Sequence, residues 1–599
     1  MSETEKQPSK WKRVPKMSFD TKNLSRRMKK AEGAAVKHAR RFVFKRWHVF
    51  REVRRNIALW VLAIGVIIGA AGLQFMWHQQ SYRTMAFGND GTYAEAALGP
   101  IDTLNPLFAA TSAEEAASEL LFSRLLNYDK DGKLNYDLAN SFTVSEDKKT
   151  YTVGIRPDAR WHDGRYVRAR DVVFTVNLLK NPATRSTISG WETITATEVN
   201  ETTVAFKLPA VYAAFPHALR FLPILPEHEL RGVDPSAVRE HPFSTKPIGS
   251  GPFKLRFIQD LESEKNRKII HMARNTDYYK GAPKLDRFQL HIYPQREAIA
   301  QALKISEVNA AADMSITDAS AVDSKRYDIK GHPVNSGVYA LLNTTSTLLQ
   351  DKKVRQALQV GTDTKAVREA VSKKLPALHL PFIDGQLSGE TPAAPAYDVA
   401  AAGKLLDEAG WVLQGTERKK DGQPLKLAVV TTKNVDFEKA LSELASQWRK
   451  LGITITTNIV DPSDQSQNVV QNILQPRRFD VLLHQLVIGA DPDVYAYWHS
   501  SQANEGSNYS NYNSSISDEA LVSARNRVEP DLRNAKYLTF ARQWVSDAPA
   551  IGLYQAVAPY VSSKRVHVMP SEAIFRSSAD RYSDVLYWSV GERAVFKTP

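Results

Sequence analysis

The chain has 599 residues, of which 43% are hydrophobic and 24% charged, and it contains no cysteine. Its length exceeds what one core supports, so several lobes are expected. The lack of cysteine excludes a disulfide framework, a thiolate nucleophile and a Cys-based zinc site. Residues 1–55 carry 18 Lys and Arg against five Asp and Glu, whereas the remaining 544 residues carry 61 against 60. The basic excess therefore belongs to the N-terminal tail, and the nearly neutral remainder argues against a nucleic-acid binder.

The first predicted element is a membrane-spanning helix over residues 57–77, with the sequence IALWVLAIGVIIGAAGLQFMW. The run carries no charged residue, and at about 1.5 Å per residue it spans roughly 30 Å of hydrocarbon. Trp60 and Trp77 lie near its ends, where indole rings prefer the membrane interface. Its length and the lack of an A-x-A cleavage site favour a retained signal anchor over a cleaved signal peptide.

Basic residues are concentrated on the N-terminal side of this helix, and the asymmetry predicts its orientation. Residues 1–56 are expected in the cytoplasm, and everything beyond the predicted spacer, 78–87, on the extracytoplasmic side of a cell membrane that is crossed once. We interpret the tail as a solvated, topogenic basic segment, with residues 1–22 disordered. A helix that lies on the anionic inner leaflet is the alternative.

Beyond the spacer, helical and strand patterns alternate as in a mixed α/β protein. The first helix is predicted over 112–126, SAEEAASELLFSRLL, where Ser112 and Glu115 match a capping box. Apolar residues at helical spacing predict further helices, over 169–180, 296–305, 351–359, 364–374, 398–409 and 435–451. Alternation and short apolar runs predict strands, over 140–145, 151–156, 202–208, 253–258, 287–293, 337–343, 425–431, 453–459 and 480–486.

One stretch, ARWHDGRYVRARDVVF at 159–174, places a histidine beside a carboxylate. His162 and Asp163 could serve as a general base, a metal ligand or an anion clamp. Gly164 follows them directly, and apolar residues at helical spacing come next, which is typical of a turn that leads into a helix. We interpret the pair as this turn.

Known catalytic motifs are missing from the sequence, which contains no phosphate loop, dinucleotide fingerprint, HExxH or G-x-S-x-G. Paired carboxylates at 114–115 and 407–408 fall on predicted helix faces, where a solvated role is expected. His and carboxylate residues do not cluster with the spacing of a metal site. The chain is therefore predicted to be no enzyme, with no cofactor and no metal.

The exported part contains a series of motifs in a fixed order. They include IDTLNPL (101–107), IGSGPFKL (248–255), RNTDYYKGAPKLDRFQLHIY (274–293), YDVAAAGKLLDEAGW (397–411) and FDVLLHQLVIGADPDVYAYWHSS (479–501). From about residue 90 to residue 560 the chain thereby resembles the extracytoplasmic solute-binding proteins of family 5, the peptide/nickel-type binding components of ABC importers. It departs from the family pattern at Arg168, where a hydroxyl-bearing residue is usual, and at Asn105, where an aspartate is usual.

The resemblance implies an α/β fold of the two-lobed periplasmic-binding-protein (Venus flytrap) type with an extra domain, here preceded by one N-terminal transmembrane helix. Its lobes are joined by hinge crossings and close around a ligand. By this prediction, lobe I comprises 88–134, 241–335 and 566–599. The extra domain comprises 135–240, and lobe II comprises 336–565.

For peptide-binding members, the resemblance implies that an aspartate in a GDPD-like stretch pairs with the free α-amino group of the ligand. The matching residue is Asp491, with Tyr495 and Trp498 as candidate walls of the ligand site. The alternative for Asp491 is a capped turn before a helix. Thr111 and Ser112, at the start of the first helix, are predicted to offer backbone and hydroxyl groups to an extended ligand.

The predicted function is that of a monomeric, membrane-anchored binding protein, which captures short peptides between its lobes and delivers them to an ABC permease with separate ATPase chains. Two alternatives stay open. The same fold could bind another solute, such as an oligosaccharide, a nickel chelate, an opine or haem, or the chain could be a tethered receptor or sensor. The sequence does not define the length or the side-chain preference of the ligand.

Overall fold

The computed structural model describes residue 37 and residues 47–596, except 88–89, 130–131, 262–266, 462–467, 505, 570–574 and 576–577. The chain forms two compact units, one of residues 1–86 with 594–599 and one of residues 87–593. The predictions for the basic tail fall largely on residues 1–36 and 38–46, which lie outside the described residues.

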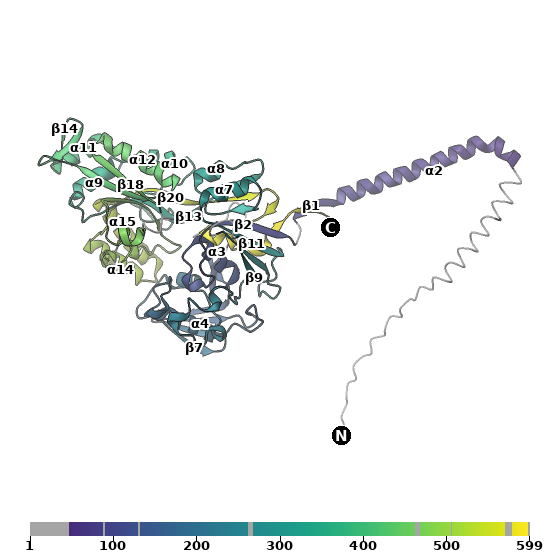
Figure 1. Cartoon of the computed structure of the whole chain (residues 1–599), viewed down its shortest axis with the longest axis horizontal. Coiled ribbons are helices and arrows are strands. Elements are labelled where there is room, and N and C mark those ends of the chain that lie inside the picture. The colour runs from purple at the N-terminus through teal and green to yellow at the C-terminus, as the bar shows by residue number, and fades with distance from the viewer. Residues whose placement is uncertain are drawn as a thin grey trace, which may run out of the picture. The chain divides into compact units, whose positions relative to one another are not determined.

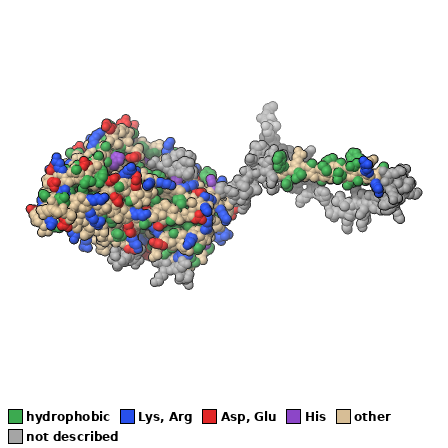
Figure 2. Space-filling view, turned by 90° about the horizontal axis from the view of Figure 1, so that it is seen from above, with side chains coloured by type: hydrophobic (Ala, Val, Ile, Leu, Met, Phe, Trp, Pro, Cys, Tyr) green, Lys and Arg blue, Asp and Glu red, His purple; other side chains and the backbone are tan. Residues whose placement is uncertain are grey.

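The N-terminal unit is built on a long helix, α2 (Trp47–Tyr82), followed by the strand β1 (Arg83–Phe87). Within α2, the 25 residues from Val53 to Trp77 are long and apolar enough to cross a membrane. Their side chains are exposed, and Figure 2 shows hydrophobic side chains covering this helix. This candidate span contains the predicted span of 57–77, begins four residues before it, with Arg54 and Arg55 among these four, and ends at the same residue.

The larger unit is built on a mixed sheet in the order β18-β17-β19-β13-β20-β12-β2-β11-β10-β9. Two long antiparallel strands, β13 (Tyr327–Leu342) and β20 (Ala550–Ser563), form its centre. On one side of them lie β17 (Lys426–Thr432), β18 (Thr454–Val460) and β19 (Val481–Val487). On the other side lie β2 (Thr92–Leu98), β9 (Phe253–Asp260), β10 (Lys268–Arg274), β11 (Arg287–Tyr293) and β12 (Ala310–Ala311).

This sheet and its helices form two lobes that share β13 and β20. Lobe I contains β2, β9–β12 and the helices α3 (Ser112–Leu121), α7 (Arg296–Lys304) and α8 (Ile316–Ser320). Lobe II contains β17–β19 and the helices α9 (Lys352–Val360), α10 (Thr364–Val371), α11 (Val399–Glu408), α12 (Val435–Lys450), α13 (Tyr495–Trp498), α14 (Ser515–Arg525) and α15 (Pro530–Asp547). In Figure 1, α10–α12 lie above the strands of lobe II, and α14 and α15 lie below them.

Side-chain alternation along β13 explains why lobe II has helices on both faces of its sheet. Val338, Ala340 and Leu342 belong to a core on the side of α9–α12, whereas Tyr339 and Leu341 belong to a core on the side of α13–α15. Successive strand side chains point to opposite faces. Because all five are at most 1% exposed, the strand is apolar on both faces.

A separate antiparallel sheet in the order β5-β6-β8-β7 lies within the segment predicted as the extra domain. Its elements are β5 (Ala139–Val144), β6 (Thr150–Ile155), β7 (Thr195–Asn200), β8 (Thr203–Lys207), α4 (Ala169–Lys180), α5 (Phe215–Arg220) and α6 (Glu227–Leu230). Apolar side chains of this segment join those of lobe I in one continuous core. The name extra domain is kept for the segment 135–240, whose boundaries, like those predicted for the two lobes, stay predictions.

Short elements complete the described part of the chain. The small strands are β3 (Leu126–Tyr128), β4 (Leu134–Tyr136), β14 (Val412–Gln414), β15 (Glu417–Lys420), β16 (Gln423–Pro424), β21 (Val566–His567), β22 (Ser589–Val590) and β23 (Glu592–Phe596). The 3₁₀ segments are η2 (Pro106–Phe108), η3 (Pro182–Thr184), η4 (Pro235–Ala237), η5 (Pro242–Ser244), η7 (Ser500–Gln502), η8 (Ser578–Tyr582) and η9 (Val585–Tyr587), and η6 (Val470–Leu474) is π-helical.

The first predicted helix, 112–126, is shorter in the structure, because α3 ends at Leu121. The amide of Gly251 donates to the Leu121 carbonyl oxygen at 2.8 Å, and the Ser123 hydroxyl donates to the Ser250 carbonyl oxygen at 2.9 Å. These contacts come from a segment far away in the sequence, so helical periodicity cannot reveal them. The capping box also differs from the predicted one, since it uses Thr111 and Glu114.

Candidate functional site

Lobe I, lobe II and the extra domain enclose a cavity of about 570 Å³, a size typical of ligand-binding pockets. Its walls come from segments far apart in the sequence. They include residues of α3 (Glu115, Ser118, Glu119), α5 and its end (Arg220, Phe221), β13 (Val334, Ser336, Val338), β20 (Tyr554, Val557, Tyr560), the start of α12 (Asp436, Phe437) and the end of β19 (Gln485, Val487).

The long central strands reach the cavity where their pairing is irregular. The register between β13 and β20 shifts between Pro333 and Gly337. Within this interval, the Asn335 carbonyl oxygen accepts from the amides of Ile488 and Gly489 at 2.9 and 3.0 Å. The side-chain amide of Asn335 donates to the Gly489 carbonyl oxygen at 2.8 Å. Such an irregularity redirects side chains out of the ladder and is common beside binding sites.

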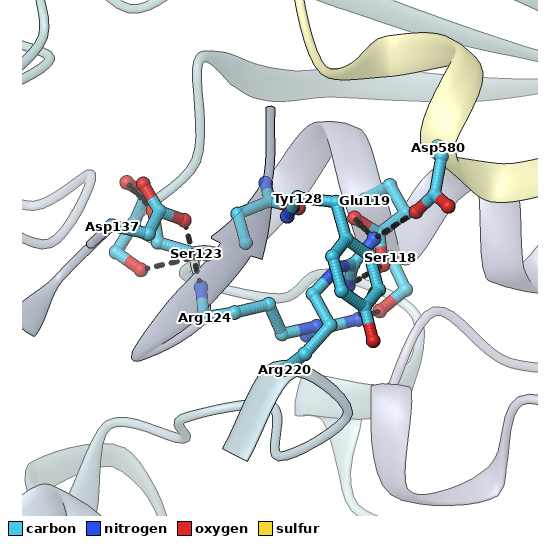
Figure 3. Close-up of polar contacts among 10 residues, drawn as sticks. Ser118, Glu119, Ser123, Arg124, Tyr128, Asp137, Arg220 and Asp580 are labelled. Atoms are coloured by element: carbon cyan, nitrogen blue, oxygen red, sulfur yellow. Dashed lines mark hydrogen bonds and ion pairs between the residues drawn. The ribbon is translucent and has the colours of Figure 1, made fainter. Parts of the chain in front are cut away.

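A buried ion cluster joins α3, α5 and η8 at one wall of the cavity (Figure 3). The Arg220 guanidinium donates to both carboxylate oxygens of Glu119, at 3.0 and 3.2 Å, and to Asp580 at 3.2 Å. Arg124 donates to the same Glu119 at 3.2 Å and to the Ser118 hydroxyl at 2.8 Å. Burial opposes ionisation of Glu119, but attraction to Arg220 and Arg124 outweighs it and lowers its pKa. The cluster therefore ties lobe I to the extra domain by paired charges.

Glu115 lies one turn before Glu119 on α3 and also lines the cavity. Its side chain is exposed to the cavity, and its carboxylate forms no hydrogen bond or ion pair within the described part of the chain. Protein surrounds it on most sides nevertheless, and this burial raises its pKa, with further contributions from the negative charges of Glu119 and Asp313. Arg581 and Arg124 act in the opposite direction from a distance, so Glu115 is an acid without a direct ion-pair partner among the described residues.

The remaining carboxylates of the cavity wall bind protein groups. Asp436 of lobe II accepts from the Ile316 amide and from the Thr317 hydroxyl, both at 2.8 Å, across the boundary to lobe I. Asp313 accepts from the Leu98 amide at 3.2 Å. Each of these two carboxylates is thus hydrogen-bonded within the protein.

Two further polar groups of the cavity wall retain unused bonding capacity. Arg296 donates from Nε to the Asp313 carbonyl oxygen at 3.0 Å, and no ion pair among the described residues includes it. The Tyr554 hydroxyl is buried and has no hydrogen-bond partner in the described structure. Buried polar groups are normally hydrogen-bonded, so such exceptions point to a functional site.

The structure places the predicted residues Thr111 and Ser112 outside the cavity wall. Thr111 is the N-cap of α3, where its hydroxyl accepts from the Glu114 amide at 3.2 Å and donates to the Pro100 carbonyl oxygen at 2.9 Å. Ser112 is the first helical residue. The hydroxyl of Thr111 is therefore already used by the helix start, and the ligand role of both residues stays a prediction.

Asp491, Tyr495 and Trp498 also lie outside the residues that line the cavity. Both carboxylate oxygens of Asp491 accept from the Arg533 guanidinium, one of them at 2.6 Å. Tyr495 is half-buried, whereas Trp498 is 1% exposed and packs edge-on against Trp544 in the core of lobe II. Trp498 packs in the core of lobe II and offers no exposed ring face in this structure. The ligand roles of Asp491, Tyr495 and Trp498 stay predictions.

Glu115 is not among the site residues predicted from the sequence, because the carboxylate pair at 114–115 is expected to be solvated. Its neighbour Glu114 is 5% exposed and accepts from the amides of Asp102, Thr103 and Ala110 at 3.0, 3.2 and 2.8 Å. The capping-box pattern could have identified Glu114 as structural. Helical rotation of about 100° per residue then directs Glu115 elsewhere.

His162 has the structural role that its turn context predicts. Its Nδ1 accepts from the Gly249 amide at 3.2 Å, and its Nε2 lies 3.1 Å from the Gly251 carbonyl oxygen. Burial lowers the pKa of His162 to about 4, so the ring is neutral at physiological pH. The histidine therefore connects the extra domain to the segment that ends α3.

One group of side chains in the extra domain could in principle hold a metal ion. Ligand atoms of Asp163, His228 and Glu229 lie within 4.8 Å of one another. His228 Nε2 is 2.9 Å from an oxygen of Asp163, and this contact accounts for the closeness of these side chains. It does not line the cavity.

Comparison with known proteins identifies the family of this chain. Residues 133–508 match the family model described as bacterial extracellular solute-binding proteins, family 5 Middle. The oligopeptide-binding protein AppA of Bacillus subtilis is 27% identical over 478 residues, which cover 78% of this chain and 86% of AppA.

Solved structures show the same two-lobed fold. AppA from Bacillus subtilis in complex with a nonapeptide superimposes with a TM-score of 0.70 and 23% identity, covering 84% of this chain and 100% of AppA. NikZ from Campylobacter jejuni in complex with Ni(L-His) gives a TM-score of 0.71 and 24% identity, covering 83% of this chain and 99% of NikZ. With the family model matched over more than half of its length, the chain belongs to the bacterial extracellular solute-binding proteins of family 5.

Proposed function

We propose that the chain is the binding component of an ABC importer, and that it captures short peptides in the cavity between lobe I and lobe II. The observation that carries this proposal is the cavity itself, which both lobes line and in which Glu115, Arg296 and Tyr554 retain unused bonding capacity. Peptides offer amines, carboxylates and amides for such groups. The oligopeptide-binding relative supports this ligand class.

In this proposal the protein acts as a tethered monomer at the outer face of a cell membrane. The apolar stretch Val53–Trp77 would anchor it, with the basic tail in the cytoplasm as its charge asymmetry predicts. A permease in the same membrane would receive the ligand, and separate chains would hydrolyse ATP. Tethering keeps the binding protein close to the permease and so raises its effective concentration there.

The proposal is tested by identifying what the protein binds. Full-length protein in detergent is purified under mild conditions, and native mass spectrometry determines the mass of any ligand that copurifies. We expect masses of short peptides, because a cavity of about 570 Å³ suits a small molecule or a short peptide. Recovery of a metal chelate without any peptide would instead favour a ligand like that of NikZ.

In this proposal Asp491 is an acid that is already paired within the protein. Both of its carboxylate oxygens accept from the Arg533 guanidinium, so a peptide amine would have to share the carboxylate with that side chain. The alternative from the sequence, a structural turn, needs no ligand. Comparing variants of Asp491 and Glu115 decides between an amine-binding role and a structural role for Asp491.

A further inference from the structure

The other carboxylates of the cavity wall are bonded by protein groups, whereas Glu115 is not bonded within the described structure. Glu119 is bonded by two arginines, Asp436 by an amide and a hydroxyl, and Arg581 pairs with the buried Glu95 at 3.0 Å. Glu115 faces the same space without a partner among the described residues. A half-enclosed carboxylate in this situation is expected at a functional site, because Arg581 and Arg124 offset its desolvation only in part.

We propose that Glu115 is the residue that binds the cationic group of the ligand, a protonated amine, by a charge-assisted hydrogen bond. This inference rests on the proposed function, since it takes the cavity as the ligand site. Asp313 adds a second negative charge close to Glu115. A bound ammonium group would therefore neutralise a locally acidic part of the wall.

A second observation supports a ligand at this position. The hydroxyl of Tyr554 lines the same cavity, is 3% exposed and has no hydrogen-bond partner in the described structure. A tyrosine hydroxyl can both donate and accept. A ligand that places an amine at Glu115 and further polar atoms in the cavity would satisfy both groups.

The rival residue for the same role is Asp491. Its carboxylate is bonded by Arg533 and lies outside the cavity wall, whereas Glu115 lies in the wall and is unbonded. An amine at Asp491 would have to share a carboxylate that Arg533 already pairs with, whereas an amine at Glu115 would meet a carboxylate without an ion pair in the described structure. Position and pairing therefore favour Glu115.

The test uses two peptide libraries and full-length protein in detergent. One library contains tri-, tetra- and pentapeptides with a free amino terminus, and the other contains the same peptides with acetylated amino termini. Calorimetric titration of wild-type protein should give at least about tenfold tighter apparent binding for the free library, since the lost bond is charge-assisted. Glu115→Gln should weaken binding of the free library by about 10- to 100-fold and abolish the preference.

Two control variants separate this role from its rivals. Glu369→Gln makes the same change on the exposed surface of α10, away from the cavity, and should leave both titrations unchanged. Asp491→Asn should retain the preference for free amino termini. Loss of the preference in Asp491→Asn but not in Glu115→Gln would overturn the inference and assign the amine to Asp491, while peptide binding as such would stand.

A third measurement does not depend on peptides. We expect millimolar n-butylammonium to raise the unfolding temperature of wild-type protein more than that of Glu115→Gln, with n-butanol as the uncharged control. If wild-type protein binds neither library, the proposed peptide function fails and the butylammonium result alone decides the role of Glu115. An equal response of the two proteins to butylammonium, together with unchanged peptide preference in the variant, refutes that role.

Discussion

Glu114 and Glu115 are neighbours in the sequence, and α3 directs their side chains to different surroundings. Glu114 accepts backbone amides at the helix start, so its negative charge is satisfied by the fold. Glu115 faces the cavity, where burial and two acidic neighbours raise its pKa. Replacing Glu115 is therefore expected to affect stability differently from replacing Glu114.

Replacing Glu115 should stabilise the ligand-free protein at neutral pH. Because the folded-state pKa of Glu115 is raised, the folded protein binds the proton more tightly than the unfolded chain, and ionisation costs stability. Arg581 and Arg124 reduce this cost, whereas Glu119 and Asp313 increase it. We expect Glu115→Gln to raise the unfolding temperature on the order of 1 °C near pH 7.

The sign of this effect defines its pH dependence. The gain from Glu115→Gln should shrink as the pH falls through the raised pKa, and it should vanish below the ordinary range of glutamate, where both states are protonated. Differential scanning fluorimetry of ligand-free protein across this range measures it, with Glu369→Gln as the control. A lower unfolding temperature of Glu115→Gln at neutral pH would show a structural role instead.

Local sequence patterns identify some of the residues discussed above and not others. The turn at His162 follows from local patterns. Glu115 does not, because its isolation depends on which partners the fold brings to its neighbours Glu119 and Asp313. The pairing of Asp491 with Arg533 likewise joins residues 42 positions apart and has no local signature.

At the scale of elements, the end of α3 shows how a distant loop overrides helical periodicity. Residues 249–251 approach Leu121 so closely that only glycine fits at Gly249. A Cβ atom there would lie 1.9 Å from the Leu121 carbonyl oxygen and 3.0 Å from the ring of His162. The reason is space rather than backbone conformation, because the clash is with the backbone of another element.

Gly249→Ala should therefore destabilise the protein by about 2 kcal/mol or more, because either α3 or the loop must shift. Denaturant unfolding measures the loss, and full function of the variant at unchanged stability would contradict the contact. Gly331→Ala is the matched control, since its Cβ atom would meet only the Val557 side chain, at 3.0 Å. We expect a much smaller change for that variant.

Other elements differ in how well the sequence predicts them. The helix predicted over 435–451 corresponds closely to α12 (Val435–Lys450), because one face is apolar at regular spacing. The strand β20 was not predicted. Its run AIGLYQAVAPYVSS is buried along most of its length, and such continuous apolar runs carry little periodicity.

At the scale of the whole molecule, the family resemblance predicts two lobes, whereas local patterns alone predict only a mixed α/β protein. The shared sheet depends on pairing between strands that are up to hundreds of residues apart, such as β2 with β11 and β12 with β20. On the face shown in Figure 2, Lys and Arg side chains of the unit of residues 87–593 are interspersed with Asp and Glu side chains. This distribution agrees with the near-neutral composition beyond the tail.

Removing the anchor should separate attachment from binding. We expect a variant that lacks residues 1–82 to leave the membrane fraction and to bind the free-amine peptide library with unchanged affinity. The cavity residues all belong to the unit of residues 87–593, which has its own core. Fractionation and calorimetry measure the two properties, and persistence of the variant in washed membranes would contradict anchoring by α2.

The two strands β13 and β20 have a mechanical consequence, since each belongs to both lobes. Any change of the angle between the lobes must twist or bend this hydrogen-bonded ladder, and the irregular register near Asn335 is where it can yield. We therefore expect the joint to be stiffer than a free linker and to bend at this position. We expect a ligand in the cavity to change the orientation of one lobe relative to the other. A docking partner that binds the outer surface of both lobes could recognise this change without contacting the ligand.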